Sequence, residues 1–226
     1  ADIDADGDVE IVVSKDTSSG LDVQAWSPDL ECDASGWVRT GHSNERLWTW
    51  SDADYSLSAP SPHFPSSQSG HRAVTQPLLE DVDLDGVNDL VLAVVDETTD
   101  DPTLLALPLD GSSPSAPLWE VALDRGTHPS DPTAVRIDGS NVDVVVTTID
   151  ASSGAMWAWK VDGGTGALDW ERAPIPGTDS DQDAPRLRLP GPVIVQLDAD
   201  AEPEVILTVP TDPNGRTSGS GARFVA

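Results

Sequence analysis

Two segments of this 226-residue chain place acidic side chains at alternate positions, turn at a glycine, and run directly into a strand-forming sequence. The first covers residues 2–10 (DIDADGDVE, followed by IVV), and the second covers residues 81–89 (DVDLDGVND, followed by LVL). A third segment, residues 196–204 (QLDADAEPE, followed by VIL), has lost the first acid and the glycine. Carboxylates this close repel one another strongly unless a cation lies between them. The fold must therefore contain tight acidic loops that each lead into a β-strand.

The chemistry of these loops favours calcium. Ca²⁺ takes about six to eight oxygen ligands, and carboxylates on alternate residues of a tight loop can converge on one point. The sixth position is Gly7 or Gly86, which lets the chain turn sharply. The ninth position is Glu10 or Asp89, whose carboxylate can close the ligand shell as the strand begins. An EF-hand is excluded, because it needs a Glu three positions later and helices on both sides.

The acidic loops mark a repeat. A fourth segment, residues 137–143, keeps only the approach to a strand, and we interpret it as a plain turn without an ion. The last acids of the four segments are Glu10, Asp89, Asp143 and Glu204, and each interval between them can hold four short strands. The 19 Pro and 18 Gly residues are spread through the chain and would interrupt helices. Four-stranded units repeated around an axis predict an all-β fold, a β-propeller.

The whole chain, 1–226, is interpreted as one β-propeller region of antiparallel blades, two complete and two partial. The chain lacks an initiator Met and begins inside an acidic loop, so we expect a processed chain or an excerpt of a longer one. Pro28–Glu45 is expected to form a hairpin insertion tipped by Gly36 and Gly41. The blade ranges are 1–60 (partial), 71–125, 131–174 and 185–226 (partial). The strands expected in the complete blades are 73–79, 90–95, 103–107, 118–123, 133–137, 142–149, 155–161 and 168–173.

The loops resemble those of the FG-GAP/VCBS-type repeat, which is found in integrin-α-like β-propellers. The resemblance covers most of the chain as a repeat series. It implies one Ca²⁺ ion in each intact loop, which clamps the first hairpin of a blade. The side-chain ligands that it implies are Asp2, Asp4, Asp6 and Glu10 in the first loop and Asp81, Asp83, Asp85 and Asp89 in the second, with backbone carbonyls from Asp8 and Val87.

The third loop has two interpretations. It is either a weaker ion site, with Asp198, Asp200 and Glu204 as its ligands, or a tight structural turn without an ion. Gln196 at the first position and Ala201 at the sixth are the departures that leave both interpretations open.

A second and weaker resemblance concerns residues 161–170 (VDGGTGALDW), which are similar to the tryptophan-docking repeat of quinoprotein-like propellers. It implies that Trp170, and with it Trp119, packs between neighbouring blades. Two further tryptophan pairs place both rings on one face of a strand, either to pack between blades or to stack on carbohydrate. These pairs are Trp48 with Trp50 and Trp157 with Trp159.

Charge and cysteine content exclude several classes of function. The chain has 12 Lys and Arg against 40 Asp and Glu, so its formal net charge is -28. Such a surface repels nucleic-acid phosphate and anionic lipid. The single cysteine, Cys32, rules out an intramolecular disulfide and a cysteine-based zinc site. The apolar runs are too short to insert in a membrane. The acidity fits calcium-loaded loops, adaptation to salt, or both.

The function expected from these features is that of a calcium-stabilised scaffold in a secreted, cell-surface or periplasmic protein. It would mediate adhesion or recognition of a protein or glycan ligand, without enzymatic activity. One alternative is an enzyme on a propeller scaffold, such as a polysaccharide lyase or a quinoprotein-like dehydrogenase. Another is a subunit of a surface filament that joins its neighbours through incomplete terminal blades.

Overall fold

A computed structural model of the chain describes residues 10–17, 20–27, 30–33, 36–39, 45–51, 75–95, 101–109, 116–136, 141–150, 155–175, 191–196, 203–207 and 223–225. Within these ranges the regular structure consists of β-strands, and the strands pair antiparallel. The expectation of an all-β fold is therefore confirmed. No helix in the described ranges is long and apolar enough to cross a membrane.

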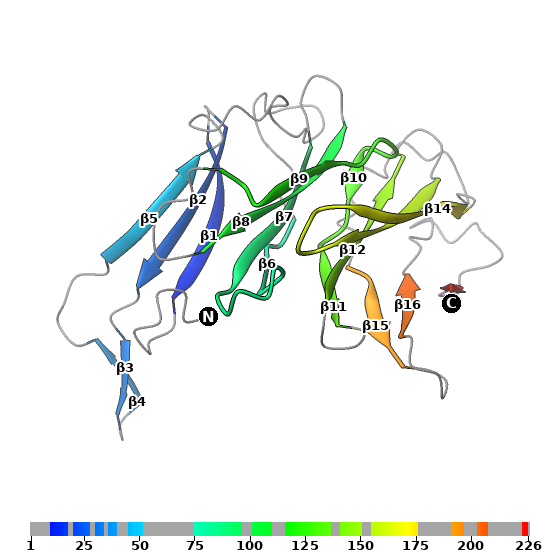
Figure 1. Cartoon of the computed structure of the whole chain (residues 1–226). Coiled ribbons are helices and arrows are strands. Elements are labelled where there is room, and N and C mark those ends of the chain that lie inside the picture. Colours follow the sequence, from blue (N-terminus) through cyan, green and yellow to red (C-terminus); the bar gives the residue numbers. More distant parts are fainter. Residues whose placement is uncertain are drawn as a thin grey trace, which may run out of the picture.

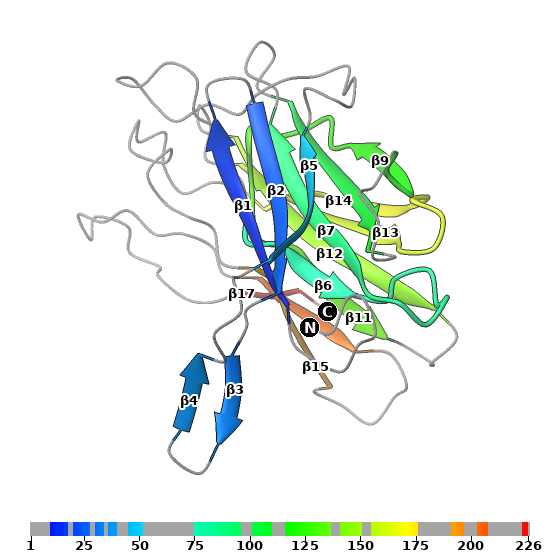
Figure 2. The ribbon, with the colours of Figure 1, turned by 90° about the vertical axis from the view of Figure 1, so that its left-hand side faces the viewer.

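The first sheet has the strand order β1-β2-β5, with β1 (Ile11–Thr17), β2 (Gly20–Ser27) and β5 (Glu45–Ser51). A separate hairpin, β3 (Leu30–Asp33) and β4 (Gly36–Arg39), is inserted between β2 and β5 and projects away from the sheets (Figures 1 and 2). The expected insertion is thus a hairpin. Its turn falls between the paired residues Asp33 and Gly36, so Gly36 begins a strand and does not form the tip. Gly41 lies outside the described residues.

Three further sheets follow along the chain, and Figure 1 shows them in succession. Each pairs strands that are close in sequence, as hairpin connections require. The second sheet has the order β6 (Leu78–Glu80), β7 (Asp89–Val95), β8 (Pro102–Pro108), β9 (Trp119–Ala122). The third contains β10 (His128–Pro129), β11 (Thr133–Arg136), β12 (Val142–Ile149), β13 (Met156–Asp162) and β14 (Leu168–Ile175). The fourth has β15 (Val193–Val195), β16 (Glu204–Leu207) and β17 (Arg223–Val225).

The strands expected in the second and third sheets are present, and most differ by one or two residues at their ends. The clearest difference is β6, which is limited to Leu78–Glu80 although the apolar run begins at residue 73. In the third sheet two short strands, β10 and β11, both pair with β12 on the side where a single strand is expected. The division into blade ranges stays a prediction.

The sheets pack face to face. In β7, Leu90 and Leu92 join a core with Val23 and Ala25 of the first sheet. The alternate residues Val91 and Ala93 of β7 join a second core with residues of β12 and β13 in the third sheet. Successive residues of a strand point to opposite faces, so β7 is apolar at nearly every position because it is buried on both faces.

The first strands of successive sheets lie beside one another. β11 contacts β6 on one side and β15 on the other. The Gln76 N–H donates to Asp131 Oδ1 at 2.5 Å, just before β6 and β11 respectively. The Thr133 hydroxyl donates to the Pro192 carbonyl at 2.9 Å, which ties β11 to the start of β15. Short polar contacts therefore hold the β6, β11 and β15 edges of three successive sheets together.

Trp119 fastens the second sheet to the third. Its ring is 7% exposed and belongs to the core between these sheets. Its Nε1–H donates to the Gly163 carbonyl in the turn between β13 and β14. Gly166 of that turn has a φ of 72° and lies so close that a Cβ there would be 2.6 Å from Trp119 Cβ. The prediction that Trp119 packs between neighbouring sheets is confirmed, and Trp157 and Trp159 lie in the same core.

The register reveals that this tryptophan position recurs. Trp119 of β9 pairs with Ala106 of β8. Trp48 of β5 pairs in the same way with Ala25 of β2. Trp170 of β14 is half-buried and pairs with Lys160 of β13. The closing strand of three sheets thus carries a tryptophan at an equivalent place.

We expect Gly166→Ala to lower the free energy of unfolding by about 2–3 kcal/mol, because the new methyl group meets Trp119 and the positive φ disfavours a Cβ. Urea unfolding followed by tryptophan fluorescence measures this. Gly164→Ala is the matched control, because a Cβ there meets nothing nearer than 3.7 Å. Equal losses from the two variants would contradict the assigned contact.

Candidate metal centre

The loop of residues 81–89 joins β6 to β7 and is folded by its own side chains. Leu84 and Gly86 take left-handed backbone conformations, with φ of 64° and 97°. The Asp85 N–H donates to Asp83 Oδ1 at 3.1 Å, and the Val87 N–H donates to Asp85 Oδ1 at 2.8 Å. Each aspartate therefore accepts from the backbone two residues ahead, which is the local turn that Asp favours.

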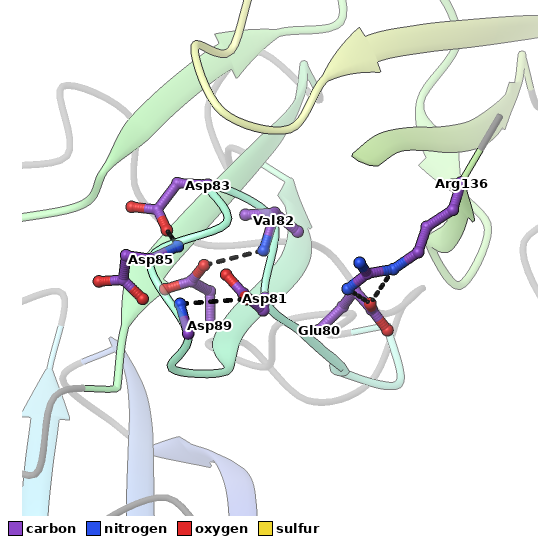
Figure 3. Close-up of polar contacts among 8 residues, drawn as sticks. Glu80, Asp81, Val82, Asp83, Asp85, Asp89 and Arg136 are labelled. Atoms are coloured by element: carbon purple, nitrogen blue, oxygen red, sulfur yellow. Dashed lines mark hydrogen bonds and ion pairs between the residues drawn. The ribbon is translucent and has the colours of Figure 1, made fainter. Parts of the chain in front are cut away.

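Two hydrogen bonds between residues farther apart in the sequence close the loop. The Gly86 N–H donates to Asp81 Oδ2 at 3.2 Å, and the Val82 N–H donates to Asp89 Oδ2 at 3.1 Å. Figure 3 shows the carboxylates of Asp81 and Asp89 close together within the turn, with that of Asp85 farther out. These bonds bring together the acids at the two ends of the loop, Asp81 and Asp89.

Three carboxylates of the loop form a group that could hold a metal ion. Asp81, Asp83 and Asp89 each offer an oxygen, and these oxygens lie within 4.8 Å of one another. Asp81 Oδ1 is buried and has no hydrogen-bond partner among the described residues. An all-oxygen set of carboxylates is the kind of site that a hard divalent cation prefers.

Asp89 carries the strongest sign of an unmet charge. It is only 2% exposed, and no ion pair to it is found among the described residues. The pKa of Asp89 is raised from its usual value of 3.8 to about 7. Burial is the main cause, and the charges of Asp83 and Asp85 add to it, while hydrogen bonds from the backbone oppose it. A cation among these carboxylates would compensate the charge that burial penalises.

The structure brings together three of the four side-chain ligands expected in the second loop. The fourth, Asp85, is exposed and outside the group, and it instead caps the Val87 N–H. The carbonyl of Val87 stays a predicted ligand.

In the other two loops the structure describes only the last acids. Glu10 is buried and 3% exposed at the start of β1. Glu204 is half-buried at the start of β16. Their expected partners lie outside the described residues, namely Asp2, Asp4, Asp6, Asp8, Asp198 and Asp200.

Sequence reasoning missed an ion pair in the third sheet. Asp143 is 4% exposed, and its Oδ2 lies 2.7 Å from Lys160 Nζ. The segment ending at Asp143 had only been expected to be a turn. A usable signal was present, because Lys160 is one of just two lysines and lies in a strand that is otherwise almost entirely apolar.

The acidic loop also lies against the third sheet. Val82 is buried in the core between the second and third sheets. A Cβ on Gly163 would be 3.0 Å from Val82 Cβ, in the turn that also receives Trp119. On the other side, the Arg136 guanidinium pairs with Glu80 just before the loop (Figure 3). The conformation of the loop is thus linked to the junction between two sheets.

No protein-family model matches the chain, and no curated protein matches it. Among solved structures, it is similar to rhamnogalacturonan lyase YesW, with a TM-score of 0.41 and 16% identity over 87% of this chain and 47% of that one. It is also similar to the exotype rhamnogalacturonan lyase YesX, with a TM-score of 0.42 and 14% identity over 87% of this chain and 45% of that one. The chain spans less than half of the length of either, and likenesses of this size carry no argument about its function.

Asp89 gives the metal-free protein a distinctive pH dependence. Its pKa is higher in the folded state, about 7, than the usual 3.8, so between these values the folded state binds more protons than the unfolded state. The contribution of Asp89 to the free energy of unfolding therefore falls as the pH rises from about 4 to about 7. Asp89→Asn cannot titrate, so in EGTA at pH 8 this variant should be more stable than the wild type.

Urea midpoints in EGTA from pH 4 to pH 8 measure the effect. The advantage of Asp89→Asn should shrink towards pH 4, where the wild-type carboxyl is also neutral. Asp124→Asn, at an exposed position remote from the loop, is the control and should follow the wild type. Parallel profiles for Asp89→Asn and the wild type would contradict the burial of a charged Asp89.

Proposed function

We propose that the 81–89 loop binds Ca²⁺ and that the chain is a calcium-stabilised segment of an FG-GAP/VCBS-type β-propeller, which acts as a recognition or adhesion scaffold outside the cytoplasm. The observation that carries the proposal is the convergence of Asp81, Asp83 and Asp89 beside a buried Asp81 oxygen that has no hydrogen-bond partner among the described residues. An ion at that point would satisfy this oxygen and offset the charge of Asp89.

The ligand chemistry supports calcium over other divalent ions. The group contains carboxylates alone, whereas zinc favours the nitrogen and sulfur of His and Cys. Calcium also accepts irregular geometry and bidentate carboxylates, while magnesium demands a near-ideal octahedron. Calcium modules outside cells bind with dissociation constants of about 10⁻⁴–10⁻³ M.

Three features support a propeller. The second sheet is buried on both faces by neighbouring sheets, the inner edges of successive sheets are tied to one another, and Trp119 docks on the next sheet. Sheets repeated around an axis bury their faces against one another and bring their first strands together, as the first two of these contacts do. The ion would then lie in the innermost hairpin of a blade, between β6 and β7, and stiffen one end of it.

A recognition role would use the parts of the chain that project from the stacked sheets and the charge of its surface. The β3–β4 hairpin projects from the sheets (Figure 2), as loops and insertions that contact partners commonly do. The net charge of -28 would attract a ligand that carries positive charge, such as a basic protein surface. The enzyme and filament alternatives stay predictions from the sequence.

Thermal unfolding tests the calcium site. Because an ion bound to the folded state alone stabilises it by mass action, 10 mM Ca²⁺ should raise the melting temperature by about 4–10 °C over EGTA. Mg²⁺ at the same concentration should have a much smaller effect. Asp83→Asn should remove most of the calcium-dependent rise, whereas Asp124→Asn removes an equal charge from an exposed site and should keep it.

Equal effects of Ca²⁺ and Mg²⁺ would indicate general screening of the acidic surface. A calcium-dependent rise that survives Asp83→Asn would place the ion elsewhere. Either result would contradict a specific ion in the 81–89 loop.

A further inference from the structure

The second and third sheets can be compared residue by residue through their strand registers. Asp89 at the start of β7 pairs with Pro108. Asp143 in β12 pairs with Asp162, at the same separation along the chain. The two aspartates therefore hold equivalent positions, and both side chains are buried. Each sheet thus confronts the same cost of placing a carboxylate away from water.

The diagonal neighbour of the aspartate on the next strand differs between the two sheets. Two residues further along each strand, Val91 pairs with Ala106, and Val145 pairs with Lys160. Ala106 and Lys160 are therefore equivalent, and each pairs on its other side with a tryptophan. One sheet has a methyl group where the other has a cation.

Lys160 supplies the charge that Asp143 needs. Its Nζ lies 2.7 Å from Asp143 Oδ2 and 3.0 Å from Asp169 Oδ2, and its side chain is 18% exposed. Burial lowers the pKa of Lys160, but the hydrogen bonds and charges of the two aspartates outweigh it and raise the pKa above its usual value. The ammonium thus stays charged between two carboxylates.

The number of acids in the loop before the buried aspartate differs between sheets that have alanine and the sheet that has lysine at the diagonal position. In the second sheet, with Ala106, the loop before Asp89 (residues 81–88) carries three acids. In the third sheet, with Lys160, the corresponding residues 135–142 carry one. The first sheet follows the second, because Ala25 pairs with Val12 as Ala106 pairs with Val91, and its loop is the fully acidic segment 2–10.

We propose that the Lys160 ammonium is a built-in cation that takes, in the third sheet, the place that a divalent ion takes in the second. The third sheet then closes its first hairpin without metal, and calcium dependence is left to the sheets with an acidic loop and an alanine. The comparison with an ion rests on the proposed function, whereas the need of Asp143 for the Lys160 charge does not.

A double-mutant cycle in the full chain tests the proposal. Lys160→Met keeps most of the apolar stem and removes the charge, so it should lower the melting temperature by about 5–10 °C. The loss should be the same in EGTA and in Ca²⁺. Adding Asp143→Asn to Lys160→Met should recover at least half of the loss, because no buried charge is then left unpaired. Lys160→Arg keeps a cation and should lose less than Lys160→Met.

Two outcomes would overturn the proposal. If Asp143→Asn gives no recovery, Lys160 acts through packing and not through charge. If Lys160→Met abolishes the calcium-dependent rise of the melting temperature, the two cation positions are not independent. Failure of the proposed calcium site looks different, because the rise would then be absent from the wild type while the cycle between Lys160 and Asp143 remained measurable.

Discussion

A carboxylate buried where β1, β7 and β12 begin is the constraint around which the first three sheets are organised. Glu10, Asp89 and Asp143 are all removed from water at this place. A buried charge is tolerated only when an opposite charge or several hydrogen-bond donors meet it. The residue on the adjacent strand and the loop before the acid differ according to how that charge is met. Where the cross-strand residue is alanine, the preceding loop gathers further acids, and where it is lysine the loop is plain.

The way in which the charge of Asp89 is compensated affects more than its own hairpin, because the loop before Asp89 also contacts the third sheet. The acidic loop of the second sheet contributes Val82, near its beginning, to the core, and Val82 contacts the Gly163 turn of the third sheet. Trp119 reaches the same turn from the outer strand of the second sheet. Loop, turn and tryptophan therefore form one junction between the second and third sheets.

The sequence was a good guide wherever a single strand or loop decided the structure. Leu90–Val95 and Val142–Ile149 are nearly continuous apolar runs, and strands buried on both faces require such runs. The spacing of Asp81, Asp83 and Asp89 was sufficient to predict that their carboxylates gather, because all three lie in one short loop. The resemblance to the tryptophan-docking repeat also predicts that Trp119 packs between sheets, but not that it contacts the turn after Asp162.

The features that sequence reasoning missed depend on how separate strands align. Lys160 meets Asp143 across a hairpin, and only the strand register shows that these residues are diagonal neighbours on one face. Asp85 fits the ligand pattern by spacing, but a left-handed residue on each side turns its carboxylate towards the Val87 N–H. The tip of the β3–β4 hairpin was misplaced because Gly36 is as acceptable in a strand as in a turn when it pairs opposite Asp33.

The face-to-face stacking of the sheets has a consequence for how such a chain can vary. Each sheet contacts its neighbours in the stack, so stability is a sum of local units and of the junctions between them. A repeat can then exchange an acidic loop for a lysine through changes confined to one hairpin, while the next repeat keeps its loop. Duplicated units can in this way drift apart in their response to the surrounding medium and still stack on one another through the same tryptophan.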